Sequence, residues 1–191
     1  KINVATNQVV WATKENIEIP APTDPEEDCQ SAYPVSVVTT AAGHVITGTY
    51  SRNPGWNYSG WQYSGQFTKF NGATGAFVWQ KDFGLDLYGR YAKMSSAGGE
   101  KVIYTGDFRG NNSNVFAPLT STSCDGGESQ SAAIACFDVS ADAPVADWAV
   151  MMCGGASATF VQGDFVYAVG YLESWGASTT VAHAPSSTAA K

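Results

Sequence analysis

The chain has 191 residues, of which 44% are hydrophobic, 13% aromatic and only 14% charged, so the composition is that of a folded globular protein and excludes a disordered or collagen-like chain. Its formal net charge of -7 argues against nucleic acid as a partner, because phosphate binding needs clustered Lys and Arg. No uncharged apolar run approaches the roughly 18 residues of a membrane-spanning helix, so membrane insertion is not expected.

The first predicted elements are two short strands within residues 1–19. Charged residues that favour helices are scarce throughout the chain, whereas Val, Thr, Tyr, Phe and Trp are frequent, so strands are expected everywhere. Apolar residues flank a turn around Asn7, and the segment closes on Trp11. We interpret residues 1–19 as the two closing strands of a split β unit. Residues 20–32, rich in Pro and acidic residues, are predicted to form a solvated linker.

Residues 33–84 are predicted to form a first complete β unit. A β-rich run at 35–40 is followed by the small residues Ala42 and Gly43 and then by a second run, which is the pattern of a hairpin. After a long loop, residues 70–75 place Asn and Gly, which tolerate positive φ, between apolar strand formers, and this predicts a second, tight hairpin. Trp79 lies at its far end, where a large ring can be buried between neighbouring sheets.

The same order of elements recurs in the rest of the chain. Residues 85–154 are predicted to form a second β unit, with a turn at Gly98 and Gly99, a long loop and a last hairpin that closes on Trp148. Residues 155–175 supply two opening strands of a further unit, joined by a turn at Gly163. Residues 176–191 are too poor in large apolar side chains to form a core and are expected to be a flexible tail of Ala, Ser and Thr.

Two motifs alternate along the chain. A hairpin motif closes on a tryptophan three times, at spacings of 68 and 69 residues: Trp11, Trp79 and Trp148. A strand motif centred on a glycine recurs out of phase with the first, at Gly48, Gly106 and Gly170. One repeat therefore contains four short strands in an antiparallel meander, the unit from which β-propellers are built. The predicted fold class is all-β, with tandem four-stranded meander units that form an incomplete propeller.

The hairpin at residues 70–79 resembles the closing element of the PQQ-like, or quinoprotein-type, β-propeller repeat, whose blades typically end with an acidic or amide residue, a Thr-Gly turn and a Trp. The segment Gly-Asp-Phe-Val-Tyr at residues 163–167 is similar to the inner strands of that family. This chain departs from the family in its longer period and at Asn7, which stands where the turn glycine is expected. The resemblance implies a partial propeller of about three units. Enzymes of the family hold pyrroloquinoline quinone and often calcium, but many members are scaffolds, so fold does not decide function.

Residues that would carry catalysis are sparse. His44 and His183 are the only histidines, neither lies near another candidate ligand in the sequence, and His44 is interpreted as a strand-end or surface imidazole. The chain has no nucleophile elbow, no zinc-binding helix motif and no phosphate-binding loop motif. Residues 82–87 offer only two carboxylates, so a linker is expected there rather than a calcium loop. We therefore assign no catalytic residue, no metal site and no cofactor.

An aromatic loop within the first unit has two interpretations. Residues 56–65 form the tandem pentapeptide Trp-Asn-Tyr-Ser-Gly-Trp-Gln-Tyr-Ser-Gly. Rings of Trp and Tyr stack on sugars while amides bind hydroxyl groups, which would make the loop a glycan site. Alternatively, the loop folds onto its own sheet or packs against a neighbouring subunit. The residues of this glycan or interface patch are Trp56, Asn57, Tyr58, Trp61, Gln62 and Tyr63.

Four cysteines lack the Cys-x-x-Cys spacing of zinc and redox sites, and this predicts disulfides. Cys124 and Cys136 bracket part of a predicted loop and are paired in this interpretation, which leaves Cys29 with Cys153, although other connectivities stay open. Two N-glycosylation sequons lie at Asn57 and Asn111. Disulfides and sequons together favour an extracellular or other oxidising, lumenal location.

The predicted units are cut open at both ends, and an unpaired sheet edge is a template for another strand. Completion within one chain would give a ring of three blades, fewer than the roughly four to eight of known propellers, so we expect completion between chains in a head-to-tail contact. The leading hypothesis is a non-catalytic structural and interaction protein that assembles with copies of itself or with another subunit into a ring or filament. The alternatives are a glycan-binding propeller module and a fragment of a quinoprotein-like dehydrogenase.

Overall fold

The protein is built from antiparallel β-strands, as seen in a computed structural model that describes residues 1–15, 31–53, 62–83, 87–109 and 130–172. In chain order the strands are β1 (Ile2–Asn3), β2 (Gln8–Val9), β3 (Ser31–Thr39), β4 (Val45–Asn53), β5 (Gln62–Phe70), β6 (Phe77–Asp82), β7 (Leu87–Ser96), β8 (Lys101–Arg109), β9 (Gln130–Asp138), β10 (Val145–Gln162) and β11 (Phe165–Leu172). Every strand pairing in the described residues is antiparallel, so the predicted all-β class with four-stranded meanders is confirmed.

The first sheet consists of β3, β4, β5 and β6 in sequence order. Its last connection is the tight hairpin predicted from the Asn-Gly-Ala-Thr-Gly sequence, because the backbone N–H of Asn71 donates to the carbonyl of Ala76 over 2.8 Å. Gly75 has a φ of +75°, which glycine adopts without a Cβ penalty. The sheet begins at Ser31, so the last two residues of the predicted linker belong to β3.

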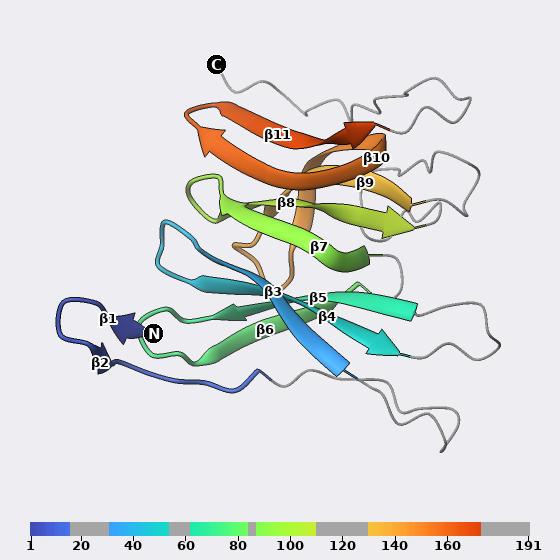
Figure 1. Ribbon diagram of the computed structural model, residues 1–191. Coiled ribbons are helices and arrows are strands. Elements are labelled where there is room, and N and C mark those ends of the chain that lie inside the picture. Colours follow the sequence, from blue (N-terminus) through green and yellow to red (C-terminus); the bar gives the residue numbers. More distant parts are fainter. Residues whose placement is uncertain (16–30, 54–61, 84–86, 110–129, 173–191) are drawn as a thin grey trace, which may run out of the picture.

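The second sheet consists of β7, β8, β9 and the first half of β10, and the second half of β10 pairs with β11 to form a two-stranded third layer. β10 pairs with β9 up to Cys153 and with β11 from Gly154 onward. At this point Gly154 has a φ of +134°, which frees the strand to turn toward the next layer. Figure 1 shows the β10–β11 hairpin above β7 and β8, the first sheet below them, and the β1–β2 hairpin beside the lower layer.

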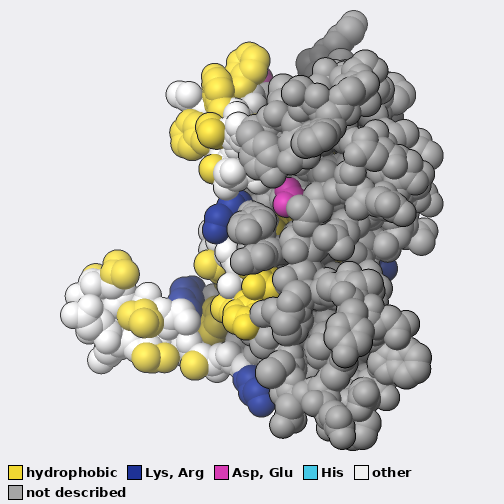
Figure 2. Space-filling model, turned by 45° about the vertical axis from the view of Figure 1, so that its right-hand side comes forward, with side chains coloured by type: hydrophobic (Ala, Val, Ile, Leu, Met, Phe, Trp, Pro, Cys, Tyr) yellow, Lys and Arg dark blue, Asp and Glu magenta, His cyan; other side chains and the backbone are white. Residues whose placement is uncertain are grey.

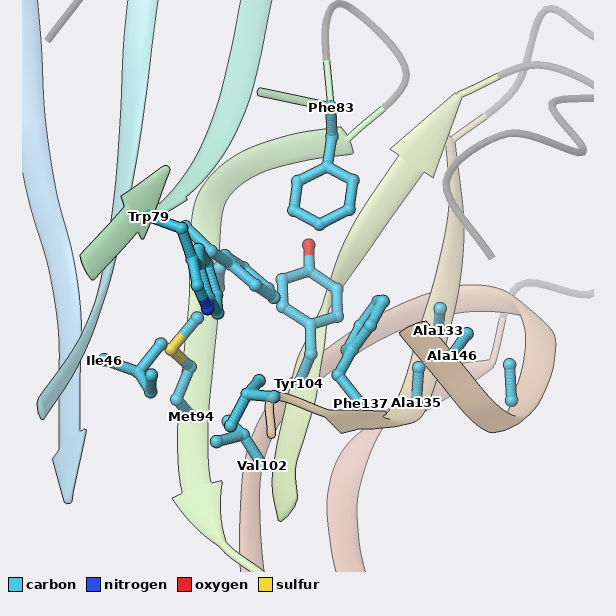
Figure 3. Close-up of a cluster of buried hydrophobic side chains, with 14 residues drawn as sticks. Ile46, Trp79, Phe83, Met94, Val102, Tyr104, Ala133, Ala135, Phe137 and Ala146 are labelled. Atoms are coloured by element: carbon cyan, nitrogen blue, oxygen red, sulfur yellow. The ribbon is translucent and has the colours of Figure 1, made fainter. Parts of the chain in front are cut away.

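The main core lies between the first and second sheets. Phe67 and Phe83 come from the first sheet and its end, Tyr104 and Phe137 from the second, and none of the four is more than 7% exposed. The ring centroids of Phe67 and Phe137 are 5.4 Å apart in an edge-to-face arrangement, and Figure 3 shows the rings of Phe83, Tyr104 and Phe137 converging. A smaller cluster that includes Ile103 lies between the second sheet and the third layer. The second sheet is therefore buried on both faces, as the middle layer of a stack must be.

Candidate functional site

The same lysine contact occurs at two successive layer boundaries. At the first, the Lys1 Nζ and the Trp11 Nε1 both donate to the carbonyl of Gly72, over 2.9 and 3.0 Å. At the next, the Lys69 Nζ donates to the carbonyl of Val139 over 2.7 Å. Lys1 and Lys69 occupy equivalent places in the repeat, and so do Gly72 and Val139. The β1–β2 hairpin therefore contacts the first sheet in the way that the β5–β6 hairpin contacts the second sheet.

The three repeat tryptophans lie at three layer boundaries. The ring of Trp11 lies over Gly75, where an added Cβ would be 2.7 Å from the ring atoms. Trp79 is 6% exposed in the main core, and its Nε1 has no hydrogen-bond partner among the described residues. Trp148 packs against the cluster between the second sheet and the third layer. Asn7, which replaces the turn glycine in the first repeat, has a φ of +56° and so keeps the left-handed geometry of Gly75.

A buried ion pair joins the first sheet to the second. The Glu100 carboxylate, in the β7–β8 turn, accepts hydrogen bonds from the Thr40 hydroxyl over 2.5 Å and from the Lys69 ammonium over 2.9 Å, and it lies 3.1 Å from His44 Nδ1. We call these four side chains the Glu100 cluster. Burial raises the pKa of Glu100, but the hydrogen bonds from Thr40, Lys69 and His44 and the charge of Lys69 outweigh it and lower the pKa from 4.5 to about 2.

The Glu100 cluster joins the first sheet to the second. The Lys69 ammonium is only 3% exposed, and it donates hydrogen bonds to the Glu100 carboxylate and to the Val139 carbonyl. A buried charge needs such partners. His44 lies directly before β4. The sequence contained one signal for this cluster: Lys69 is two residues from Phe67 in the same strand, so both side chains point to the face that the core buries.

The outer face of the third layer is apolar and exposed. Its inner face contacts the second sheet, where the Thr105 hydroxyl donates to the Thr159 hydroxyl over 3.0 Å. Alternation along the paired strands then points the neighbouring side chains outward. We call this outer surface the tail face, and its large side chains are Phe160, Phe165, Tyr167 and Val169, which are 62%, 68%, 54% and 69% exposed.

The opposite end of the stack is apolar and exposed as well. Val37 on β3 is 66% exposed, and it lies on the face of the first sheet that points away from the second sheet. Together with the β1–β2 hairpin it forms what we call the head face, whose members are Ile2, Val4, Val9, Val10 and Val37. Figure 2 shows hydrophobic side chains gathered on the protruding N-terminal hairpin and again on the third layer, at the two ends of the molecule.

Most of the predicted aromatic patch falls outside the described residues. Trp56, Asn57, Tyr58 and Trp61 lie in the segment 54–61, which the structure does not describe. Gln62 and Tyr63 are the first two residues of β5 and pair with β4, so the strand extends into the predicted loop. The second sequon, Asn111, also lies outside the described residues. The choice between a glycan site and an interface therefore stays open.

The predicted disulfide between Cys124 and Cys136 is wrong, because Cys136 carries a free, buried thiol. Cys136 lies near the far end of β9, about 20 Å along the strand from its first residue, Gln130. Burial, followed by the negative charge of Asp147, raises the pKa of its thiol to about 11. Cys153 lies in β10, and Cys29, like Cys124, falls outside the described residues, so their pairing stays a prediction.

Comparisons with protein-family models, with curated proteins and with solved structures found no match for this chain. Within the described part of the chain, no helix is long and apolar enough to cross a membrane. Among the same residues, no group of three or more His, Cys, Asp and Glu side chains is placed to hold a metal ion. The resemblance to the PQQ-like repeat stays a prediction.

Proposed function

We propose that this protein is a non-catalytic structural protein whose propeller-like β layers assemble with other copies of the chain, or with a partner chain, into a ring or filament. The observation that carries the proposal is the pair of exposed apolar faces, head and tail, at the two ends of a stack whose internal faces are buried. Contiguous exposed apolar surface on a folded protein marks an interaction site. The predicted exported or lumenal location is part of this proposal.

The exposed area is large enough to drive association. Each of the four large side chains of the tail face is more than half exposed. Complete burial of such a side chain contributes about 1.5 to 3 kcal/mol, so covering the exposed part of one contributes about 1 to 2 kcal/mol to the free energy of association. The head face has five such side chains. A contact that covers both faces therefore gains about 9 to 18 kcal/mol, against an association cost of about 4 to 15 kcal/mol. The gain equals or exceeds the cost over most of these ranges, so covering both faces favours association.

Sedimentation velocity over a range of protein concentrations tests this proposal. We expect species heavier than the 20.1 kDa monomer, and we expect Tyr167→Arg to shift them toward the monomer. Val145→Arg is the matched control, because Val145 is 48% exposed on the second sheet, away from both faces. If the folded wild-type protein sediments as a single 20.1 kDa monomer at every concentration, the proposal is wrong.

A further inference from the structure

We propose that the partner is a second copy of this chain, docked so that its head face covers the tail face of the first. This inference rests on the proposed function, because it specifies the partner and the two surfaces that meet. The internal boundaries of the stack share one construction. The β1–β2 hairpin with the first sheet carries one half of that construction on its outer side, and the third layer carries the other half.

The first strand of each layer lies against the first strand of the next. Between β3 and β7, the Ser36 hydroxyl accepts a hydrogen bond from the backbone N–H of Met94 over 2.9 Å. Between β7 and β10, the Ser95 hydroxyl donates to the carbonyl of Thr159 over 3.3 Å. The next residue along β10, Phe160, points to the opposite side, where no further layer is present among the described residues, and it is 62% exposed. The tail face therefore corresponds to one side of a contact between two layers, and no layer covers it among the described residues.

Val37 lies on the surface that has the position of the other side of such a contact. Val37 pairs with Thr47, two residues after Val45, the partner of Phe70. Met94 pairs with Tyr104, two residues after Val102, the partner of Phe137. Because Phe70 and Phe137 are equivalent in the repeat, Val37 and Met94 are equivalent as well. Met94 is 8% exposed because the first sheet covers it, whereas Val37 is 66% exposed. At β3, the outer side of the first sheet therefore presents the surface that the second sheet uses to bind the layer before it. Over β4 and β5 that side already contacts the segment after β2, where the Glu15 carboxylate accepts hydrogen bonds from the Thr47 and Thr68 hydroxyls.

The β1–β2 hairpin has the form of the two strands that the third layer lacks. In the first sheet, β4 pairs on one side with β3 and on the other with β5, whereas β11 pairs only with β10 within the described residues. Ile2 is the repeat equivalent of Phe70, the last residue of β5. Phe70 is 3% exposed and Ile2 is 63% exposed, so pairing of β1 with β11 of another copy would place Ile2 in a Phe70-like position.

Both contacts form in one docking movement. The β1–β2 hairpin already stands one layer before the first sheet, as the shared contacts of Lys1 and Lys69 establish. When it completes the third layer of a neighbouring copy, the first sheet that follows it is laid over the tail face. The contact uses different surfaces on the two copies, so repetition gives a closed ring or an open filament.

Two complementary variants test the head-to-tail contact. The tail variant carries Tyr167→Arg and Val169→Arg, and the head variant carries Ile2→Arg and Val37→Arg; all four side chains are more than half exposed, so the fold should tolerate the changes. We expect each variant alone to sediment as a monomer. An equimolar mixture should form a heterodimer of about 40 kDa and nothing larger, because it retains one intact head and one intact tail.

Other results of this experiment would overturn the head-to-tail contact. Self-association of the head variant would show a tail-to-tail contact, and self-association of the tail variant a head-to-head contact; both overturn the inference. A mixture that stays monomeric while the wild type is oligomeric overturns it as well, and leaves the proposed function intact. A monomeric wild type overturns both. Circular dichroism checks that the variants fold, and a second pair, Phe165→Arg and Val9→Arg, repeats the test at other exposed positions of the two faces.

Discussion

Replacement of Glu100 by Gln should destabilise the protein at neutral pH and much less in acid. The folded-state pKa of this carboxyl is about 2, against 4.5 for the unconstrained group. Since one pKa unit corresponds to about 1.4 kcal/mol, the ionised carboxylate contributes about 3 kcal/mol to stability at pH 7. The pKa is lowered on folding, so this contribution is complete above pH 4.5 and is lost as the pH falls toward 2. At pH 3 about 1 kcal/mol should remain.

Urea denaturation of the wild type and of Glu100→Gln at several pH values between 7 and 3 measures this difference directly. The two curves of unfolding free energy should converge as the pH falls, because every other titrating group is common to both proteins. A difference that is the same at pH 3 as at pH 7 would refute the assignment of the lowered pKa to folding of Glu100.

A second variant tests whether the unpaired Lys69 ammonium causes the loss of stability in Glu100→Gln. Glu100→Gln removes the anion beside Lys69, which is 3% exposed, and an unpaired buried ammonium costs about 3 to 5 kcal/mol. Lys69→Met in the Glu100→Gln background removes that ammonium and should restore part of the lost stability. If the double variant is less stable than Glu100→Gln alone, the ion pair is not the source of the effect.

Three further predictions concern packing. Gly75→Ala and Gly43→Ala should each lower the free energy of unfolding by about 1 kcal/mol, because φ is positive at both positions. Only Gly75→Ala should also speed amide hydrogen exchange in the N-terminal hairpin, because the added Cβ would meet the ring of Trp11. Equal exchange in the two variants would contradict this contact. Phe67→Ala should lower the unfolding free energy in urea by about 3 to 5 kcal/mol, and a loss below about 1 kcal/mol would contradict its place in the core. The Cys136 thiol, with its raised pKa, should react with a thiol reagent at pH 8 only as fast as the protein unfolds, and rapid labelling of the native protein would show that it is accessible.

The sequence was sufficient for the elements that local chemistry specifies. The scarcity of charged helix formers predicted strands, and the residues 71–75 predicted a tight hairpin by their tolerance of positive φ, which the backbone of Gly75 confirms. The predicted boundary between residues 154 and 155 falls beside the point where β10 changes partner. These features depend on residues that are neighbours in the chain, so a linear pattern reveals them.

Features that depend on distant residues were missed or wrong. Glu100 and Lys69 meet only because two sheets stack, and nothing near either residue in the sequence indicates the other. The predicted disulfide rests on Cys124 and Cys136 bracketing part of a predicted loop, but Cys136 lies in strand β9 with a buried, free thiol. The continuity of β10 is likewise not visible in the sequence, because Gly154 and Gly155 interrupt its apolar pattern.

That continuity has a consequence for folding. β10 runs for 18 residues through two layers without an intervening loop, so the third layer cannot detach without pulling on the backbone of the second sheet. The second sheet and the third layer should therefore unfold as one cooperative unit, with shared amide protection in native-state exchange. Among the described residues, the first sheet is connected to them through the chain between β6 and β7, through side-chain contacts, and through a hydrogen bond from the backbone N–H of Ala41 to the carbonyl of Gly99 over 2.9 Å. Under a stretching force applied along the stack, rupture should begin between the first and second sheets.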